Sequence, residues 1–592
     1  MTPRRLFRPL TLAGLCAVLA AGASCSSGMD RIDRKVNALL AETSQAIGAA
    51  GAPVAGALSA GEARGDPTEE HPATVNPPAD DLAFAAQVLP VTEGGRTDAQ
   101  QVIDRLEGYS RMPEDAQSMD LAAALAYACA HSREYRFAEE EYVLSALRLL
   151  TERHRWGPRF FDEVGASVVG SGEEGMFDTA LSLVNELRVT QRLPYGGEVS
   201  ARALARATED LHQRVSGENV QDAEFILSAD IPLLRGAGDV AREDLIQAER
   251  RLIYAAREFE RFRREFLFDI ARDYLDLIVA QQRIENAERG VRSLQQVEAQ
   301  QEALLKAGRN TPFDAAEATN RTLEAIDQLN SARENYRLSL DRFKVRLGMQ
   351  VDQPLVIERD SLRLSTPKIE MDEAIYAAMS FRLDLQTQRD QLDDARRAVR
   401  TARNALLGDL NFQASVSIPT DDDNARGGLD FEAGSASFLA GITYGLPLDR
   451  EIERVNLRQT EIALERARRG YGQYRDDVAV TVRGAVRGID SALFSLQIQE
   501  RNVEIAFQRE ASIAADPARA DIRQRTDAID QTARARNARD GARRDLEVAV
   551  LRYLLETGQL RVLPDGYVQP LRGMQMGEAQ PVGESASPGP GP

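Results

Sequence analysis

The chain has few of the residues that build reactive or covalently stapled sites. Its 592 residues include three cysteines, four histidines and one tryptophan. Two cysteines, Cys25 and Cys129, lie beyond residue 24, which is too few for a disulfide framework. The histidines share no metal-ligand spacing. We therefore expect no disulfide-rich module, no metal site and no cofactor.

Aromatic residues and clustered positive charge are also scarce. Aromatic residues make up 6% of the chain, charged residues make up 28%, and the formal net charge is −19. A nucleic-acid-binding protein needs clusters of Lys and Arg, whereas acidic and basic residues here are interspersed. This balance suits long solvated helices with a thin core. We predict a mainly α-helical, extended protein with no nucleic-acid partner.

The first 24 residues have the pattern of an export signal. Three arginines within the first eight residues precede an apolar stretch, Leu10–Ala21, that is too short to span a membrane. Cys25 follows a small-residue context, as at the processing site of a bacterial lipoprotein, although Gly22 stands where such sites usually have Leu. We expect residues 1–24 to be a signal peptide and Cys25 to be lipidated, with a plain cleaved signal as the alternative.

Two segments have the composition of disordered chain. Residues 25–117 hold one amphipathic stretch around Asp30–Ile47 and are otherwise rich in Gly, Pro and acidic residues. Such a segment cannot bury enough apolar surface to fold, so it is predicted to be a largely disordered, lipid-anchored tether. Residues 563–592 are equally rich in Pro and Gly and are predicted to be a disordered tail.

The sequence between these segments contains the same unit twice. Residues 223–253 and 437–467 each read as an alternating strand, an Ile-Pro-Leu or Leu-Pro-Leu corner and a long helix. Self-similarity of this kind marks a repeated structural unit. Each repeat is predicted to begin with a short helix and to continue with strands and a helical hairpin. The expected ranges are 118–357 for the first repeat (strands about 183–234, hairpin about 240–347) and 358–562 for the second (strands about 408–449, hairpin about 451–557).

The predicted strands alternate apolar and polar residues with a period of two. The apolar set in one of them is Leu410, Phe412, Ala414, Val416 and Ile418. This pattern fits a transmembrane barrel and also a soluble sandwich, so the alternation alone leaves both open. A turn-like segment, Leu193–Gly197, has no counterpart in the second half and leaves the strand count open.

The predicted helices are too long to stand alone. Val240–Lys306 and Glu451–Ser512 contain no proline, and helices of this size are about 90–100 Å long. Heptad spacing of apolar residues indicates that they pack on other helices, at Ile270, Leu277, Ile284 and Val291. The seam is thin, so we expect assembly. At the first hairpin tip, Gly308 suits a left-handed C-cap and Thr311 an N-cap.

This plan resembles the TolC-like outer-membrane efflux channel family, or outer membrane factors, in a lipoprotein-type form. The resemblance is carried by the corners Ile231–Gly238 and Leu446–Asp449 and by the tip from Ala307 to Ala318. The resemblance covers about residues 118–562. It implies a homotrimeric tube of mixed α and β structure. Each chain would give four strands to a shared twelve-stranded transmembrane β-barrel and its coiled helices to a periplasmic tunnel.

The resemblance also implies a function and partners. The chain would be the outer-membrane channel of a tripartite efflux or type I secretion system, a passive conduit from periplasm to exterior. Its partners would be a periplasmic adaptor (membrane fusion) protein, an inner-membrane transporter of RND, ABC or MFS type, and outer-membrane lipid. No nucleophile with a base and no phosphate loop indicates an enzyme. The alternative is a lipid-anchored periplasmic coiled-coil adaptor or envelope spacer, which would not need lipid-facing strands.

Candidate site residues lie at the two hairpin tips. The resemblance implies that Gly308, Asp314 and Ala318 contact the adaptor. The second tip departs from this pattern with three acidic residues, which threefold symmetry would turn into an entrance gate whose like charges raise their pKa values: Asp521, Asp527 and Asp530. The competing interpretation is that these are solvated faces and helix caps, a role that suits Asp527 and Asp530.

Overall fold

The computed structural model describes two compact units. Its described residues are 25–48, 117–173, 176–210, 220–359, 369–420, 431, 433–515, 521–562 and 568–569. The first unit draws on residues 1–47, 141–257 and 386–474, and the second on residues 48–140, 258–385 and 475–592. The predicted signal peptide and most of the predicted tether and tail lie outside the described residues.

The helices confirm the predicted duplication. The first half holds α6 (Leu121–His131), α7 (Arg133–Arg155), α8 (Glu243–Lys306) and α9 (Pro312–Leu347), and the second holds α10 (Met371–Phe381), α11 (Leu383–Asn404), α12 (Glu451–Ala515) and α13 (Ile522–Glu556). Corresponding helices match in length, with 64 and 65 residues in α8 and α12 and 36 and 35 residues in α9 and α13. The same plan is therefore used twice.

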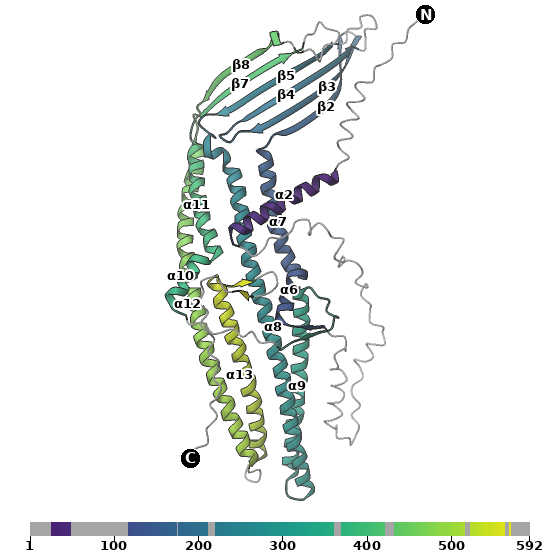
Figure 1. The fold of residues 1–592 in the computed structure, drawn as a ribbon, viewed down its shortest axis with the longest axis vertical. Coiled ribbons are helices and arrows are strands. Elements are labelled where there is room, and N and C mark those ends of the chain that lie inside the picture. The colour runs from purple at the N-terminus through teal and green to yellow at the C-terminus, as the bar shows by residue number, and fades with distance from the viewer. Residues whose placement is uncertain are drawn as a thin grey trace, which may run out of the picture. The chain divides into compact units, whose positions relative to one another are not determined.

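Six antiparallel strands form one sheet in the first unit (Figure 1). In the order of the sheet they are β2 (Arg159–Glu173), β3 (Met176–Arg192), β4 (Glu198–Asp210), β5 (Val220–Pro232), β7 (Asp409–Pro419) and β8 (Ser437–Gly445). The expectation of four strands per chain, beginning near residue 183, is wrong. The expected strand range omits β2 and the first part of β3, because Asp162 and the glycines of β2 interrupt its apolar alternation.

The turn predicted at Leu193–Gly197 joins β3 to β4. The Leu193 amide donates to the Gly197 carbonyl over 3.0 Å, and the Gly196 amide donates to the Leu193 carbonyl over 3.0 Å. Both glycines have positive φ, 106° at Gly196 and 86° at Gly197. This conformation favours glycine because a Cβ atom would be strained there.

We expect Gly197→Ala to destabilise this turn strongly. A Cβ atom on Gly197 would lie 2.1 Å from the Asp230 carbonyl oxygen, so β5 would have to shift. Gly236→Ala is the matched control, because Gly236 also has positive φ, 77°, yet nothing lies within 4 Å of its added Cβ. The control should cost about 1–2 kcal/mol from backbone strain alone, and Gly197→Ala clearly more. Urea unfolding measures both, and equal losses would contradict this expectation.

An N-terminal helix, α2 (Cys25–Ala46), belongs to the first unit. Its apolar residues Val36, Leu39 and Leu40 are buried at helical spacing. The Tyr142 hydroxyl of α7 donates to the Leu40 carbonyl over 3.3 Å and lies 3.2 Å from the Ser44 hydroxyl. This helix covers most of the amphipathic stretch Asp30–Ile47 that the sequence sets apart from the rest of the predicted tether, and the apolar side of the stretch packs on α7.

Long-helix packing forms the core of the second unit. Ile270, Leu277 and Val291 of the predicted seam are buried. Val291 packs with Ile326 and Leu329 of α9. A polar contact helps to fix how α8 and α13 align. The side-chain amide of buried Asn286 donates to the Asn537 side-chain oxygen of α13 over 2.8 Å. The predicted coiled-coil packing is confirmed for α8.

In both repeats, a glycine after the returning helix lies close to the backbone of a short helix. Gly348 follows α9 with φ 85°, and a Cβ there would lie 2.3 Å from the His131 carbonyl oxygen at the end of α6. Gly558 follows α13 with φ 73°, and a Cβ there would lie 3.0 Å from the Phe381 carbonyl at the end of α10. The returning helix therefore ends against the break between two short helices in both halves.

Candidate functional site

One face of the six-stranded sheet is mostly apolar. The pairing register aligns one apolar residue from every strand in a single row, in the order Phe160, Val189, Ala201, Leu227, Val416 and Phe438. Side chains alternate between faces along a strand, so residues two positions away extend the same face. The row crosses strands of both halves of the chain. The hairpin β2–β3, which the second half lacks, therefore shares one apolar surface with β4, β5, β7 and β8.

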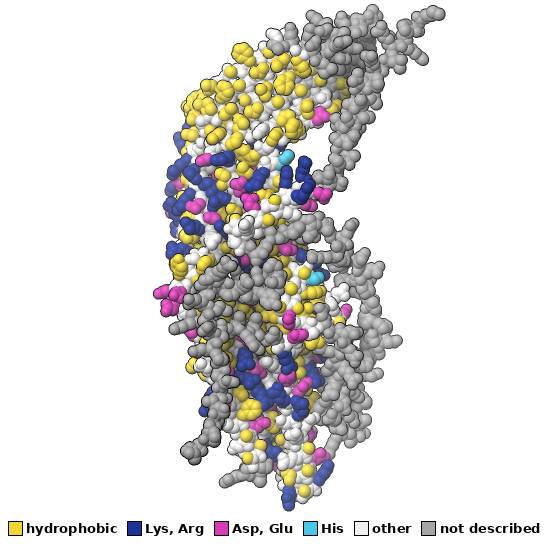
Figure 2. All heavy atoms as spheres, in the orientation of Figure 1, with side chains coloured by type: hydrophobic (Ala, Val, Ile, Leu, Met, Phe, Trp, Pro, Cys, Tyr) yellow, Lys and Arg dark blue, Asp and Glu magenta, His cyan; other side chains and the backbone are white. Residues whose placement is uncertain are grey.

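This apolar face is exposed in the single chain. Phe160 is 72% exposed, Ile442 67% and Phe438 85%. Figure 2 shows hydrophobic side chains gathered over the strands. Two polar residues on this face, Asp162 and Asn185, pair with each other, and the Asn185 side-chain amide donates to the Asp162 carboxylate over 3.1 Å. A contiguous exposed apolar surface of this kind marks contact with lipid or with another protein.

The opposite face of the sheet is mostly polar and carries ion pairs. On this face too, the pairing register aligns one residue from every strand in a row: Arg159, Thr190, Ser200, Ser228, Ser415 and Leu439. Arg202 pairs with Glu186 at 3.0 Å, and the Ser200 and Ser228 hydroxyls lie 2.7 Å apart. A sheet with one apolar and one polar face can separate hydrocarbon from water.

The described helices have a different surface character. None of them is both long enough and apolar enough to cross a membrane. Their ion pairs are frequently spaced three or four residues apart, as between Arg261 and Glu265 of α8 at 2.8 Å. Such pairs suit solvated helices.

The first hairpin tip has the caps that the sequence predicts. Gly308 follows α8 in the left-handed conformation with φ 70°. Thr311 is the N-cap of α9, its hydroxyl accepting from the Asp314 amide over 3.2 Å and donating to the Asp314 carboxylate over 2.6 Å. Asp314 is thus held by the cap, and Phe313 beside it is 63% exposed. The tip is a fixed turn with an exposed aromatic side chain.

Ala318 lies inside the helical core. Its exposed fraction is 1%, and it packs in a cluster with Leu294 and Val297 of α8 and Ile522 and Ile529 of α13. Its small side chain lets three helices approach closely. Its place in the structure is therefore in packing, whereas Gly308 and Phe313 are exposed at this tip and Asp314 is half-buried.

At the second tip, the three acidic residues occupy different environments. Asp521 is the N-cap residue of α13, although its side chain makes no capping hydrogen bond. Asp527 and Asp530 lie within α13, so the prediction that they cap a helix is wrong. The helix begins earlier, at Ile522, because the residues from 522 to 526 are compatible with a helix. Asp527 is exposed and Asp530 half-buried. Burial raises the pKa of Asp530, against the opposing effect of Arg534 and Arg321.

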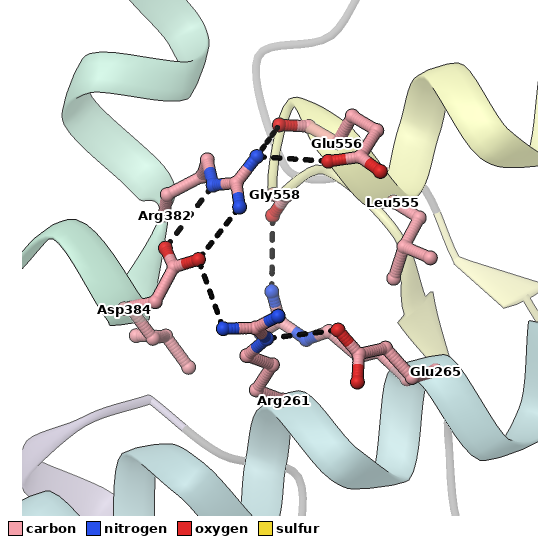
Figure 3. Close-up of a pocket in the computed structure, with 9 residues that line it drawn as sticks. Arg261, Glu265, Arg382, Asp384, Leu555, Glu556 and Gly558 are labelled. Carbon is pink, nitrogen blue, oxygen red and sulfur yellow. Dashed lines mark hydrogen bonds and ion pairs between the residues drawn. The ribbon is translucent and has the colours of Figure 1, made fainter. Parts of the chain in front are cut away.

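A charged cluster in the second unit surrounds a cavity of about 70 Å³ (Figure 3). Arg382, at the break between α10 and α11, pairs with Asp384 at 2.6 Å and with Glu556 of α13 at 2.8 Å. Arg261 of α8 reaches the same Asp384 carboxylate at 3.2 Å. Arg264 donates to the Gly558 carbonyl over 3.1 Å. Acids and bases here satisfy one another, so the cluster is a structural joint between helices.

The stability of the second unit is expected to depend on pH through Glu547. Burial raises the pKa of Glu547 in α13 from 4.5 to about 7, with Arg543 opposing. The folded state therefore keeps a proton that the unfolded state has lost, so this contribution to stability falls as the pH rises from about 4.5 to about 7. We expect Glu547→Gln to flatten the unfolding free energy over that range.

The control for this pH effect is Asp545→Asn. Asp545 lies two residues away, is exposed, and pairs with Arg544 at 2.9 Å. Thermal unfolding from pH 4 to pH 8 should show the normal slope in Asp545→Asn and a reduced slope in Glu547→Gln. Identical slopes for the wild type and Glu547→Gln would contradict the assignment.

Comparison with known proteins shows which fold this is. No family model and no curated protein matches the chain. Among solved structures, the outer membrane protein VceC from Vibrio cholerae matches with TM-score 0.57 and 14% identity, covering 74% of this chain and 96% of that one. The outer-membrane channel OprN matches with TM-score 0.56 and 14% identity over 79% and 97%, and CusC, described by its transmembrane channel formation, with TM-score 0.55 and 14% identity over 74% and 92%.

These matches establish the fold class. The chain has the fold of the TolC-like outer-membrane channels, with two repeats of helices, strands and a long helical hairpin. One part of the candidate site lies outside the strand range expected from the sequence, the apolar residues of β2. The available signal was Phe160, Val164 and Val168, which share one face at even spacing.

Proposed function

We propose that the chain is the outer-membrane channel of a tripartite efflux or type I secretion system, a passive conduit between periplasm and exterior. The observation that carries this proposal is the apolar row across all strands, exposed at Phe160 and Phe438, with a polar surface behind it. Lipid is the occupant that such a face fits. The structures with the same fold are channels, which supports a role without chemistry of its own.

The helices support assembly of several copies. α12 buries one apolar edge in its own chain, including Val482 and Ile489. A second apolar set on the same helix stays exposed at heptad-related spacing, at Val480, Phe494, Ile498 and Ile505. Matching helices of neighbouring copies would cover this set. We propose the homotrimer, with its helices forming a periplasmic tunnel.

The partners follow from the same proposal. The first tip, with Gly308 and Asp314, would dock on a periplasmic adaptor, and the adaptor would connect the tube to an inner-membrane transporter. Cys25 begins α2, so a lipid on Cys25 would place this helix near the membrane surface. Ala318 would act indirectly, by fixing the packing of the helices behind the tip.

The second tip is the proposed entrance gate. Three copies of Asp521, Asp527 and Asp530 would form acidic rings that attract cations and resist closure when charged. We expect Asp527→Asn with Asp530→Asn to lower the preference for cations in planar-bilayer conductance. Glu334→Gln, an exposed acid farther along α9 that pairs with Arg337, is the control that should leave the preference unchanged. An unchanged preference in the double variant would remove these residues from the gate.

A lipid-anchored adaptor or envelope spacer is the competing function. It would keep the strands in water, where a continuous exposed apolar face is unfavourable by about 25 cal/mol per Å². The discriminating experiment is membrane fractionation of the wild type and of Cys25→Ser, followed by single-particle imaging. We expect both to be extracted only by detergent, as trimeric tubes. A water-soluble monomer or dimer for Cys25→Ser would overturn the channel proposal and leave the spacer.

A further inference from the structure

The two outer strands of the sheet each have one edge without a partner strand among the described residues. Among the described residues, β2 pairs only with β3 and β8 only with β7. β8 has nine residues without a charge or Pro. β2 has 15 residues without Pro, and two of its four charged residues, Arg159 and Asp162, bond to Thr190 and Asn185 of β3. Natural sheets protect free edges with charged side chains, Pro, bulges or very short strands, because an open edge can pair with another strand. Both edges therefore have the character of strands that are paired in the working protein.

We propose that β8 of one copy pairs with β2 of the next, so that every copy contributes six strands to one closed ring. The inference rests on the proposed function, which supplies the membrane and the three copies. Three copies with six strands each make an eighteen-stranded ring. The occupant of each edge is thus a second copy of this chain.

The direction and the faces of the strands support this pairing. All neighbouring strands in the sheet are antiparallel, and their number is even, so β2 and β8 run in opposite directions. Pairing β8 with β2 of another copy therefore continues the antiparallel pattern. Phe160 on β2 and Phe438 on β8 also end the same apolar row, so the joined sheet keeps one apolar side. A register shifted by one residue would break that continuity.

The added hairpin accounts for the extra strands. In the second half α11 ends at Asn404 and β7 begins at Asp409, whereas in the first half residues 159–192 insert β2 and β3 before β4. At ordinary strand spacing and tilt, twelve strands close a ring about 24 Å across and eighteen strands one about 36 Å across. The hairpin also brings charge to the polar side, including Glu186 and Arg188. The ring would be wide and lined in part by ion pairs.

Imaging of the full-length protein in lipid nanodiscs tests the ring directly. We expect cross-sections with eighteen strands and a diameter near about 36 Å. A trimer with twelve strands would overturn this inference and leave the proposed conduit intact. Particles without any closed ring would overturn both.

Disulfide cross-linking tests which strands meet, in a background with Cys25→Ser and Cys129→Ser. Leu439→Cys on the polar side of β8 is combined in turn with Phe161→Cys, Glu163→Cys or Gly165→Cys on β2, which scans the register between copies. Leu439→Cys with Arg202→Cys on β4 is the control, because β4 is already paired on both sides. We expect a ladder of linked copies with one β2 position and none with Arg202→Cys. A ladder with Arg202→Cys, or trimers that no β2 position links, would overturn the pairing.

Discussion

Leu227→Arg is expected to prevent stable insertion of the sheet in the membrane. Leu227 lies near the middle of β5, is 45% exposed on the apolar face, and forms part of the row that crosses all six strands. An arginine on the lipid side of a transmembrane strand costs about 2–4 kcal/mol near the bilayer centre. Three copies would each carry that cost in one assembly. Urea unfolding in lipid vesicles and the yield of trimer from the membrane fraction measure the effect.

The matched control is Ile226→Arg, one position away on the same strand. Ile226 lies on the polar face, between Arg202 of β4 and Ser417 of β7 in the pairing register. A positive charge there would meet water in the proposed channel, so we expect a loss well below that of Leu227→Arg. Equal losses for the two variants would show that both faces are in the same medium, as in a soluble sandwich.

Glu260→Gln is expected to cause the largest loss of stability in the second unit. The Glu260 side chain of α8 is 3% exposed and binds Arg263 at 2.8 Å and Arg264 at 2.9 Å. Removing the carboxylate leaves two buried guanidinium groups without the anion that they share. Breaking a buried ion pair from one side costs about 3–5 kcal/mol. Chemical unfolding followed by helical circular dichroism measures this loss.

Glu265→Gln provides the comparison on the same helix. Glu265 pairs with Arg261 at 2.8 Å, but both side chains are 46% exposed, so solvent screens the pair. An exposed pair at this spacing contributes about 0.3–0.5 kcal/mol. A loss for Glu260→Gln no larger than that for Glu265→Gln would mean that water reaches the Glu260 site.

Much of the candidate site could be predicted from local sequence. The apolar positions of β5, β7 and β8 follow from strict alternation, since side chains of a strand alternate between faces. The left-handed turn at Gly308 and the cap at Thr311 follow from the residue types that those conformations require. Asp527 and Asp530 could not be placed in this way, because a helix start depends on several neighbouring residues and an acidic side chain suits both caps and exposed helix faces.

Other parts depended on contacts between distant residues. Asp162 makes β2 look unlike a strand, and only the register places it beside Asn185, where the two polar groups satisfy each other. Ala318 looks like any exposed helical alanine until Ile522 and Ile529 of α13 pack against it. In both cases the residue's environment is set by a segment far away in the chain.

The sequence by itself determined the duplicated plan, the long proline-free helices, the strand corners and the caps at the first tip. Each of these is set by periodicity or by a residue whose backbone preference acts over a few positions. Only the tertiary structure decided that the sheet has six strands, that one apolar face crosses all of them, and that α2 packs on α7. Pairing register and helix packing are fixed by burial summed over many distant contacts, and no local pattern contains that sum.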